Sequence, residues 1–320
     1  MVKKKILITG GSGYIGGRLC LHFANEGYSV TSLCHSKIPS NQDWVSKMEK
    51  VVIGDVRDEL FLIELAKDNY DIVIHLVSLD HHQSNLSPTF VSSVNITPVW
   101  SILEIFSKQG LSKFIYFSTA QIYGTLQDEH VLENQTLKPQ NPYGLTHQIG
   151  EVLCDYYNRK SSVDCSIIRL SNSYGAPLFE ENNCWWLVIN DLCQMAYKKK
   201  EIVLQSDGSP LRDFIHGWDV CSGVQTVVET SNKQHFVYNL SSGKTLSILD
   251  IAEKVKKIYL DRYNVELVIT KAKSNHNITE KRVYKIDNSL ICQIGFEPKW
   301  SLEMGINDLF DFLEKTMFKK

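Results

Sequence analysis

The sequence lacks both an excess of charge of one sign and a long hydrophobic run at its start. Its 320 residues include 34 lysines and arginines against 36 aspartates and glutamates, a formal net charge of −2 at pH 7. Such a balance gives no attraction for nucleic acid or for an anionic membrane, so we expect neither as a partner. The first apolar run, Ile6 to Ile8, ends at Thr9 and glycines, which is too short for a signal peptide or a membrane span. The chain is therefore expected to be cytoplasmic, with one large or two modest domains.

Metal-binding and redox patterns are also missing. The eight cysteines form no C-x-x-C pair and show no ligand-like spacing with histidine, so no metal site is expected. We expect them to be buried free thiols. The chain also lacks internal repeats and low-complexity linkers, which favours two halves that pack as one unit with a cleft between them.

Short apolar runs alternate with helical patterns through the first half of the chain. The runs read KKKILITG, YSVTSL, KVVIGD, YDIVIHLV, KFIYFST and DCSIIRLS. This alternation predicts an α/β fold, a Rossmann-type doubly wound parallel sheet with helices on both faces. We expect a nucleotide-binding domain over residues 1–171. A smaller, less regular C-terminal region over residues 172–320 would bind substrate, with about 212–240 returning to pack on the sheet.

A glycine motif lies between the first predicted strand and the first predicted helix. Gly10, Gly13 and Gly16 form G-x-x-G-x-x-G in this position. Glycines there permit a tight turn and close approach of the backbone to a pyrophosphate at the positive end of the helix. The pattern predicts that the domain binds NAD or NADP.

The acidic residue that binds the ribose of NAD is missing from the end of the second strand. Cys34 and His35 stand in its place, followed by Ser36 and Lys37. Donors and a cation without a carboxylate suit a 2′-phosphate, which favours NADP over NAD. In the alternative, Lys37 faces water and backbone groups hold the ribose.

The stretch NPYGLTHQIGE predicts a helix that begins near Tyr143. Asn141 is a good N-cap and Pro142 suits the first turn. Tyr143 and His147, four residues apart, would share one helix face. Thr119, at the end of the strand KFIYFST, would meet them where open α/β sheets bind ligands.

With these motifs in this order, the chain resembles the extended short-chain dehydrogenase/reductase family, in its branch of nucleotide-sugar epimerases, dehydratases and ketoreductases. The resemblance runs nearly end to end through ITGGSGYIGGRL, GDVRD, VIHLVS, FSTAQIYG, NPYGLTHQIGE, RLSNSYGA and LRDFIHGWDV. It implies a nucleotide-sugar substrate and a homodimer. Members dimerise through paired helices, and here apolar helical faces include Trp100, Phe106, Leu153 and Tyr157.

The resemblance also implies roles for individual residues. Thr119, Tyr143 and His147 would be catalytic, with Tyr143 transferring the proton. The expected cofactor-binding residues are Gly10, Gly13, Tyr14, Ile15, Gly16, His35, Lys37, Asp55, Val56, Leu76, Asn95, Tyr143 and His147. The expected substrate-binding residues are Ser78, Thr119, Gln121, Asn172, Gln205, Arg212 and Arg282. For Arg212, a structural ion pair with Asp213 or Asp219 is an equal alternative.

Two departures from the family pattern guide the functional hypothesis. The family's Tyr-x-x-x-Lys is Tyr-x-x-x-His here, which removes a fixed cation that stabilises tyrosinate. Ala120 and Gln121 replace the Asp-Glu pair of dehydratases, so a 4,6-dehydratase is not expected. Ketone reduction needs a neutral tyrosine, its default state.

We therefore expect an NADP-preferring reductase of a nucleotide-linked 4-keto or 4-keto-6-deoxy sugar, in deoxysugar or surface-polysaccharide biosynthesis. The alternatives are a C4 epimerase with bound NAD and a catalytically silent nucleotide-sugar-binding protein. Two further pairs are not expected to take part in the site. We expect His81 and His82 to be solvated, and Trp185 and Trp186 to be core residues.

Overall fold

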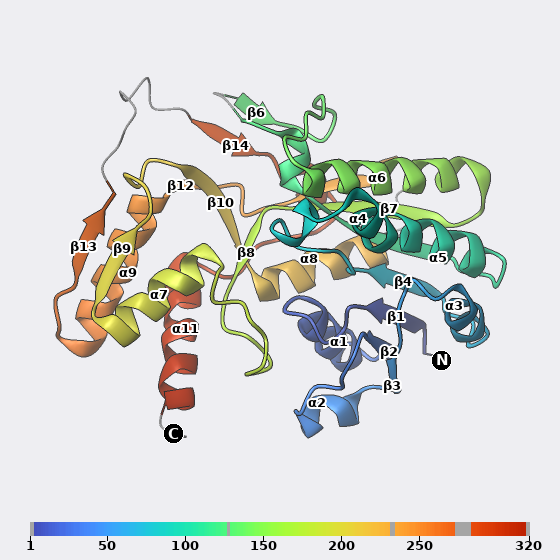
Figure 1. The fold of residues 1–320 in the computed structure, drawn as a ribbon, viewed down its shortest axis with the longest axis horizontal. Coiled ribbons are helices and arrows are strands. Elements are labelled where there is room, and N and C mark those ends of the chain that lie inside the picture. Colours follow the sequence, from blue (N-terminus) through green and yellow to red (C-terminus); the bar gives the residue numbers. More distant parts are fainter. Residues whose placement is uncertain (1–2, 127–128, 231–233, 273–282, 318–320) are drawn as a thin grey trace.

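A seven-stranded parallel sheet forms the centre of the molecule (Figure 1). The structure, a computed structural model, describes residues 3–126, 129–230, 234–272 and 283–317. The strand order is β11-β7-β5-β4-β1-β2-β3, and all neighbouring strands are parallel. The strands are β1 Lys5–Thr9, β2 Ser29–Cys34, β3 Lys50–Ile53, β4 Ile72–His75, β5 Lys113–Thr119, β7 Asp164–Leu170 and β11 Val237–Leu240. The predicted Rossmann-type sheet is confirmed.

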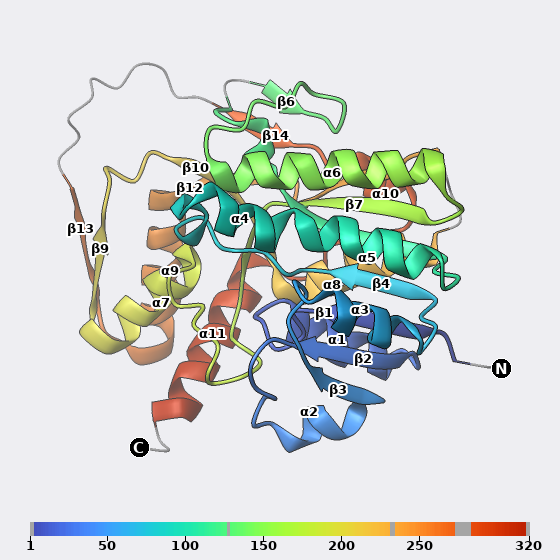
Figure 2. The ribbon, with the colours of Figure 1, turned by 45° about the vertical axis from the view of Figure 1, so that its right-hand side comes forward.

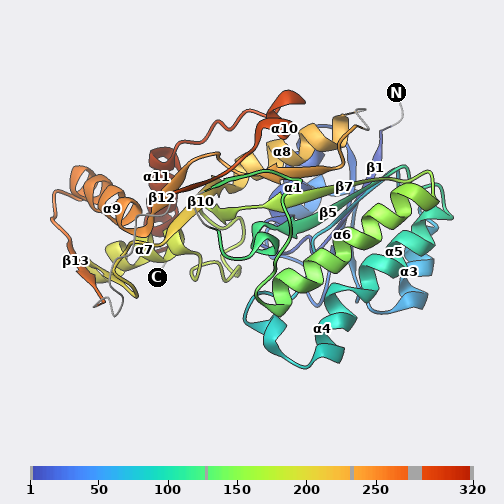
Figure 3. The same cartoon turned by 90° about the horizontal axis from the view of Figure 1, so that it is seen from above.

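Helices cover both faces of this sheet, which explains why its strands are apolar runs without alternation (Figure 3). One face carries α1 Gly16–Asn25, α2 Gln42–Lys47, α8 Gly217–Glu229 and α10 Ser289–Gln293. The other carries α3 Glu59–Ala66, α5 Thr97–Ser107 and α6 Pro142–Lys160. Each layer has its own hydrophobic cluster, so the sheet is shielded from water on both sides.

A smaller lobe lies beside the sheet, on the left of Figure 1. Its cluster joins α7 Val188–Lys199, α9 Ile248–Tyr263 and α11 Leu302–Met317 to β9 Glu201–Leu204, which pairs with β13 Val268–Lys271. Two further small sheets lie between the lobes: β8 Asn172–Tyr174 with β10 Leu211–His216 and β12 Thr245–Ser247, and β6 Glu129–Val131 with β14 Tyr284–Ile286. The chain thus leaves the main sheet after β7 and returns to it in β11.

The strand order reverses between β1 and β4. The chain moves outward from β1 through β2 to β3, and from β4 through β5 to β7. Loops on the two sides of such a point diverge and leave a crevice at the carboxyl ends of the strands. β1 and β4 are neighbouring strands (Figure 2), and the glycine turn after β1 and the segment after β4 both line one cavity.

The helical segment between β4 and β5 is divided at Ile96. α4 (Pro88–Asn95) ends at Ile96, and α5 begins at Thr97 with Pro98 in its first turn. By length and composition alone, Pro88–Ser107 could cross a membrane, with a mean hydropathy of 1.2. A core helix passes the same test, and Val99, Ile102 and Phe106 of α5 belong to the hydrophobic cluster under this layer.

The exposed apolar face of α5 and α6 differs from the expected one. Phe106 and Tyr157 are buried within their own chain, whereas Trp100 is 55% exposed. The apolar residues of α6 that face outward are Leu145, Ile149, Val152 and Tyr156. The reason is helical rotation, since neighbouring positions lie about 100° apart. The cysteine prediction is corrected at one position: Cys292 is exposed, while the other seven are buried free thiols.

Candidate active site

The glycine turn after β1 shapes one end of a cavity of about 970 Å³. Gly10 has a φ of +73°, and its carbonyl accepts a hydrogen bond from Gly13. A Cβ at Gly16 would lie 2.1 Å from the Gly10 carbonyl oxygen. α1 begins here without a side-chain cap, so the positive end of the helix lies at this turn. The turn therefore fits the pyrophosphate of a dinucleotide, and Gly10, Gly13, Tyr14, Ile15 and Gly16 all line the cavity.

The predicted catalytic residues line the same cavity. The Asn141 side chain accepts a hydrogen bond from the Gly144 backbone at 2.8 Å and caps α6. The first turns of α6 then place the rings of Tyr143 and His147 with their centroids 4.5 Å apart. Burial raises the pKa of Tyr143 to about 12, and its side-chain hydrogen bond with Thr119 opposes this rise. Tyr143 is therefore a protonated donor near neutral pH.

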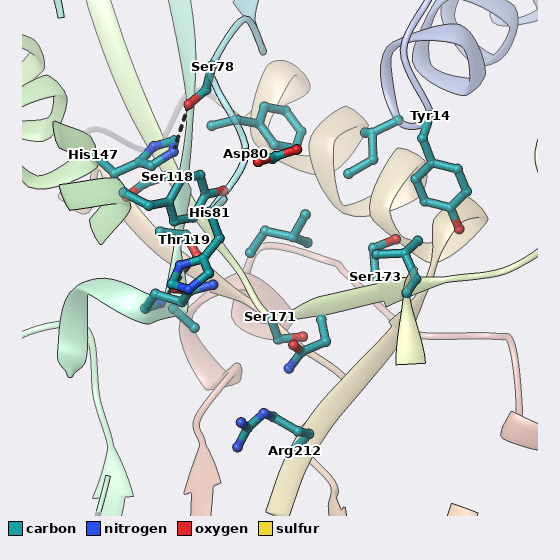
Figure 4. A pocket seen from close by; sticks show the side chains of 18 of the residues that line it. Tyr14, Ser78, Asp80, His81, Ser118, Thr119, His147, Ser171, Ser173 and Arg212 are labelled. Carbon is teal, nitrogen blue, oxygen red and sulfur yellow. Dashed lines mark hydrogen bonds between the residues drawn. The ribbon is translucent and has the colours of Figure 1, made fainter. Parts of the chain in front are cut away.

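His147 is buried and its two ring nitrogens have different partners. Nε2 lies 3.3 Å from the Ser78 hydroxyl, and Nδ1 lies 3.2 Å from the Tyr116 hydroxyl (Figure 4). Burial lowers the pKa of His147 to about 4, against a backbone hydrogen bond with Phe117. The imidazole is thus neutral near pH 7 and does not replace the charge of a lysine.

The segment after β4 forms the wall beside these residues. Ser78, Asp80 and His81 line the cavity, and the His81 ring centroid lies 6.5 Å from that of Tyr143. Buried Asn95 accepts a hydrogen bond from the Leu79 backbone at 2.8 Å and donates one to Thr146 of α6 at 3.0 Å. Asn95 therefore holds this wall against α6 instead of lining the cavity itself.

Polar and aromatic groups border the far end. Asn172, Arg212 and Tyr284 also line the cavity, and Figure 4 shows Arg212 apart from Tyr14 of the glycine turn. Arg212 donates to its own neighbour, the Leu211 carbonyl, and within the described ranges no carboxylate ion-pairs with it. Asp213 instead accepts from Ser171 and Ser242, and Asp219 from the backbone of Lys299 and Trp300. The structural ion pair considered for Arg212 is therefore wrong.

Several predicted residues lie elsewhere. His35, Lys37, Asp55, Val56, Asn95 and Gln205 do not line this cavity, and Arg282 lies outside the described residues. Gln205 is exposed just after β9. His35 Nε2 lies 3.6 Å from the Asp55 carboxylate, which Arg57 also binds. The loop after β3 thus places a carboxylate beside His35, just after the end of β2.

Two residues to which the sequence analysis assigned no role in the site, His81 and Trp186, do line the cavity. His81 is exposed as expected but faces Tyr143. Trp186 is 59% exposed and borders the substrate end, whereas Trp185 packs on the cluster of the smaller lobe. The expected core role of Trp186 is wrong because α7 begins only at Val188, which leaves both tryptophans in the preceding loop. His81 lies shortly after the end of β4, where the strand order reverses. This position was the sequence signal that could have indicated a place in the cavity.

A buried ion pair lies behind the site. Arg169 of β7 binds Glu151 of α6 with two hydrogen bonds, at 3.0 and 2.7 Å. The Glu151 carboxylate also accepts from Ser118, next to Thr119, at 2.6 Å. This network fixes α6 against the ends of β5 and β7. The sequence analysis did not identify it, since nothing in residue type pairs positions 18 apart.

Known proteins resemble this chain over nearly its full length. It is 26% identical to the low-salt glycan biosynthesis protein Agl12 of Haloferax volcanii, over 96% of this chain and 97% of that protein. It is 25% identical to a putative UDP-glucose 4-epimerase of Methanocaldococcus jannaschii, over 97% and 99%.

Among solved structures, a UDP-glucuronic acid 4-epimerase from Bacillus cereus, in complex with UDP-glucuronic acid and NAD, has a TM-score of 0.77 at 24% identity. The match covers 98% of this chain and 99% of that one. At this identity the likeness concerns the fold. A family model, the NAD dependent epimerase/dehydratase family, matches residues 6–241. The chain therefore belongs to the NAD dependent epimerase/dehydratase family.

Proposed function

We propose that the protein is an NAD-dependent C4 epimerase of a nucleotide-linked sugar. The observation that carries this proposal is a single cavity lined by three groups of residues. These are the glycine turn after β1, the set Thr119, Tyr143 and His147, and the pair Asn172 and Arg212. A dinucleotide and a nucleotide sugar would meet end to end at Tyr143. The names of the Methanocaldococcus relative and the Bacillus structure support the epimerase over the reductase favoured by the sequence.

The chain's own residues would bind and orient the sugar. Thr119 and Tyr143 would hydrogen-bond the oxygen at C4, and Tyr143 would exchange its proton with that oxygen. Arg212 lines the cavity without a carboxylate partner among the described residues, and its guanidinium group suits a diphosphate. When bound, NAD supplies a hydride acceptor that later returns the hydride. Neutral His147, beside Ser78, would hydrogen-bond the ribose.

We propose NAD in place of the expected NADP, because the cations near the end of β2 already have anionic neighbours. His35 and Arg57 both bind Asp55, and the Asp55 carboxylate has a pKa lowered to about 2, chiefly by its Arg57 hydrogen bond. The pKa of Glu181 is lowered, chiefly by a backbone hydrogen bond and then by Ser40, with a smaller contribution from Lys37. A 2′-phosphate would therefore have to compete with carboxylates for these groups.

A 4-ketoreductase is the second candidate, and one observation favours it. Tyr143 is protonated near neutral pH and no lysine stabilises its anion. A proton donor suits ketone reduction, whereas epimerisation begins with proton removal. A dehydratase is not proposed, because Ala120 and Gln121 offer no acid and base.

The two candidates differ in cofactor use. We expect the purified protein to release NAD on denaturation and to convert one member of a panel of UDP-, dTDP-, GDP- and CDP-hexoses or uronic acids into its C4 epimer. This reaction consumes no cofactor. Stoichiometric oxidation of NADPH or NADH by a nucleotide-linked 4-keto-6-deoxy sugar, without epimerisation, would establish the reductase instead. Binding without turnover of any of these compounds would contradict both and indicate a silent binding protein.

A further inference from the structure

The environment of His147 contains a hydroxyl group that the proposed reaction does not use. Tyr116 of β5 is buried, and its OH lies 3.2 Å from Nδ1 of His147. Burial raises the pKa of Tyr116 well above its ordinary value, so this hydroxyl keeps its proton. It points away from the cavity, since Tyr116 is not among the cavity residues whereas His147 is. It therefore contacts the imidazole from behind.

The partners on the other side of the ring determine which nitrogen carries hydrogen. Ser78 donates its single hydroxyl proton to the Leu79 carbonyl at 3.0 Å. Its oxygen can then only accept from His147 Nε2, 3.3 Å away. A neutral imidazole has one N–H, so Nδ1 has none and accepts a hydrogen bond from Tyr116.

The surroundings of Tyr116 are shaped to hold its hydroxyl in this place. A Cβ at position 150, one turn after His147 on α6, would lie 2.2 Å from the Tyr116 oxygen, so the glycine provides the space. The His75 ring packs nearly parallel to that of Tyr116, with centroids 6.4 Å apart. His75 is itself fixed by Thr9, 2.9 Å from its Nδ1. These contacts leave Tyr116 little freedom to move away from His147.

We propose that Tyr116 is a positioning residue that fixes His147 in the tautomer with hydrogen on Nε2. The uncharged ring then directs an N–H donor toward Ser78 and the cavity, where a lysine would place an ammonium group. Gly150 belongs to the same arrangement, because it makes room for the hydroxyl. The tautomer of His147 is determined by neighbouring protein groups and does not require a bound cofactor or substrate. Its use, a hydrogen bond to the nicotinamide ribose, rests on the proposed function.

The tautomer can be measured without cofactor or substrate. Protein labelled with ¹⁵N-histidine gives separate signals for protonated and bare ring nitrogens, and His147→Gln identifies those of His147. We expect Nε2 to be protonated and Nδ1 bare near neutral pH. In Tyr116→Phe, which removes only the hydroxyl, both signals should move toward each other as the second tautomer becomes populated. Gly150→Ala should act in the same direction, because its Cβ displaces the Tyr116 ring.

A matched control is Tyr157→Phe, on the same helix as His147, which removes a hydroxyl that donates to Glu104 of α5. It should leave the His147 signals unchanged. Hydrogen on Nδ1 in the wild-type protein would overturn the proposal, even if Tyr116→Phe failed to fold. So would a Tyr116→Phe spectrum identical to that of the wild type.

A separate measurement, the affinity for NAD, tests whether the His147 N–H contributes to cofactor binding. If the Nε2 hydrogen holds the ribose, Tyr116→Phe should weaken NAD binding about fivefold, the effect of one hydrogen bond. Tyr157→Phe should not. Unchanged affinity in a protein whose tautomer has shifted would overturn the ribose contact and leave the tautomer assignment intact.

Discussion

Two side chains determine the chemistry of this site, and burial affects them in opposite directions. Burial raises the pKa of Tyr143 to about 12 and lowers that of His147 to about 4. Both groups are therefore uncharged near neutral pH. Without a fixed cation from the protein, stabilisation of a tyrosinate must come from the bound cofactor, whose oxidised nicotinamide is positively charged. This dependence separates the protein from relatives with a Tyr-x-x-x-Lys pair.

Replacing Tyr143 by phenylalanine tests the proton-transfer role directly. We expect kcat to fall by roughly 100-fold or more, since general acid–base groups contribute about 10² to 10⁴. NAD content after purification should be unchanged, because the ring remains. Tyr156→Phe, on the exposed face of α6, is the control. Near-full turnover in Tyr143→Phe would rule out the proposed proton transfer.

At the scale of elements, local sequence signals correctly predicted α6 and the shared face of Tyr143 and His147. Asn141 and Pro142 identify the start of the helix, and the four-residue spacing brings Tyr143 and His147 together. Contacts between distant segments were not predictable in this way. Asp55 meets His35, and Trp186 reaches the cavity, through loop paths that no periodicity encodes.

The N-cap of α6 should affect both stability and activity. Asn141→Ala removes the acceptor of the Gly144 N–H and is expected to cost about 1 kcal/mol in free energy of unfolding. It should also lower kcat/KM, because the first turn of α6 carries Tyr143. Urea unfolding and steady-state kinetics check the two effects.

Asn41→Ala provides the comparison, since Asn41 caps α2 in the same way and does not line the cavity. We expect a similar loss of stability with unchanged kinetics. Equal kinetic effects in the two variants would show that the cap of α6 has no special connection to catalysis.

The exposed apolar face of α5 and α6 predicts self-association. Trp100 and Val152 are 55% and 60% exposed on these helices, and a surface patch of this kind is typical of an interface. The double variant Trp100→Lys, Val152→Lys should shift a homodimer to monomer in light scattering coupled to gel filtration. Leu260→Lys, on exposed α9, should not. A wild-type monomer, or a dimer unaffected by the double change, would contradict this interface.

At the scale of the whole molecule, buried neutral histidines make stability depend on pH. Burial lowers the pKa values of His75 and His147 to about 3 and about 4. In the unfolded chain they titrate near 6.5. Between about pH 4 and pH 6.5 only the unfolded chain binds these protons, so the free energy of unfolding falls as pH falls through this window. Each histidine contributes up to about 1.4 kcal/mol per pH unit.

Urea unfolding of the wild type and His147→Gln across this window checks the effect. The wild-type curve should be steeper, and the stability of the wild type relative to His147→Gln should fall toward acid pH. Parallel curves would show that His147 titrates alike in the folded and unfolded states.

In the proposed reaction, a hydride leaves and returns to the same sugar carbon within one cavity. The sheet topology and the glycine turn were predictable from sequence; the direction of the reaction was not, because it depends on burial and on the bound cofactor. The most direct measurement uses a nucleotide sugar that the protein accepts, with deuterium at C4, in ordinary water. The account predicts a C4 epimer that keeps its deuterium at C4, without added cofactor. A product with hydrogen at C4, or turnover only with added NADH or NADPH, would contradict it.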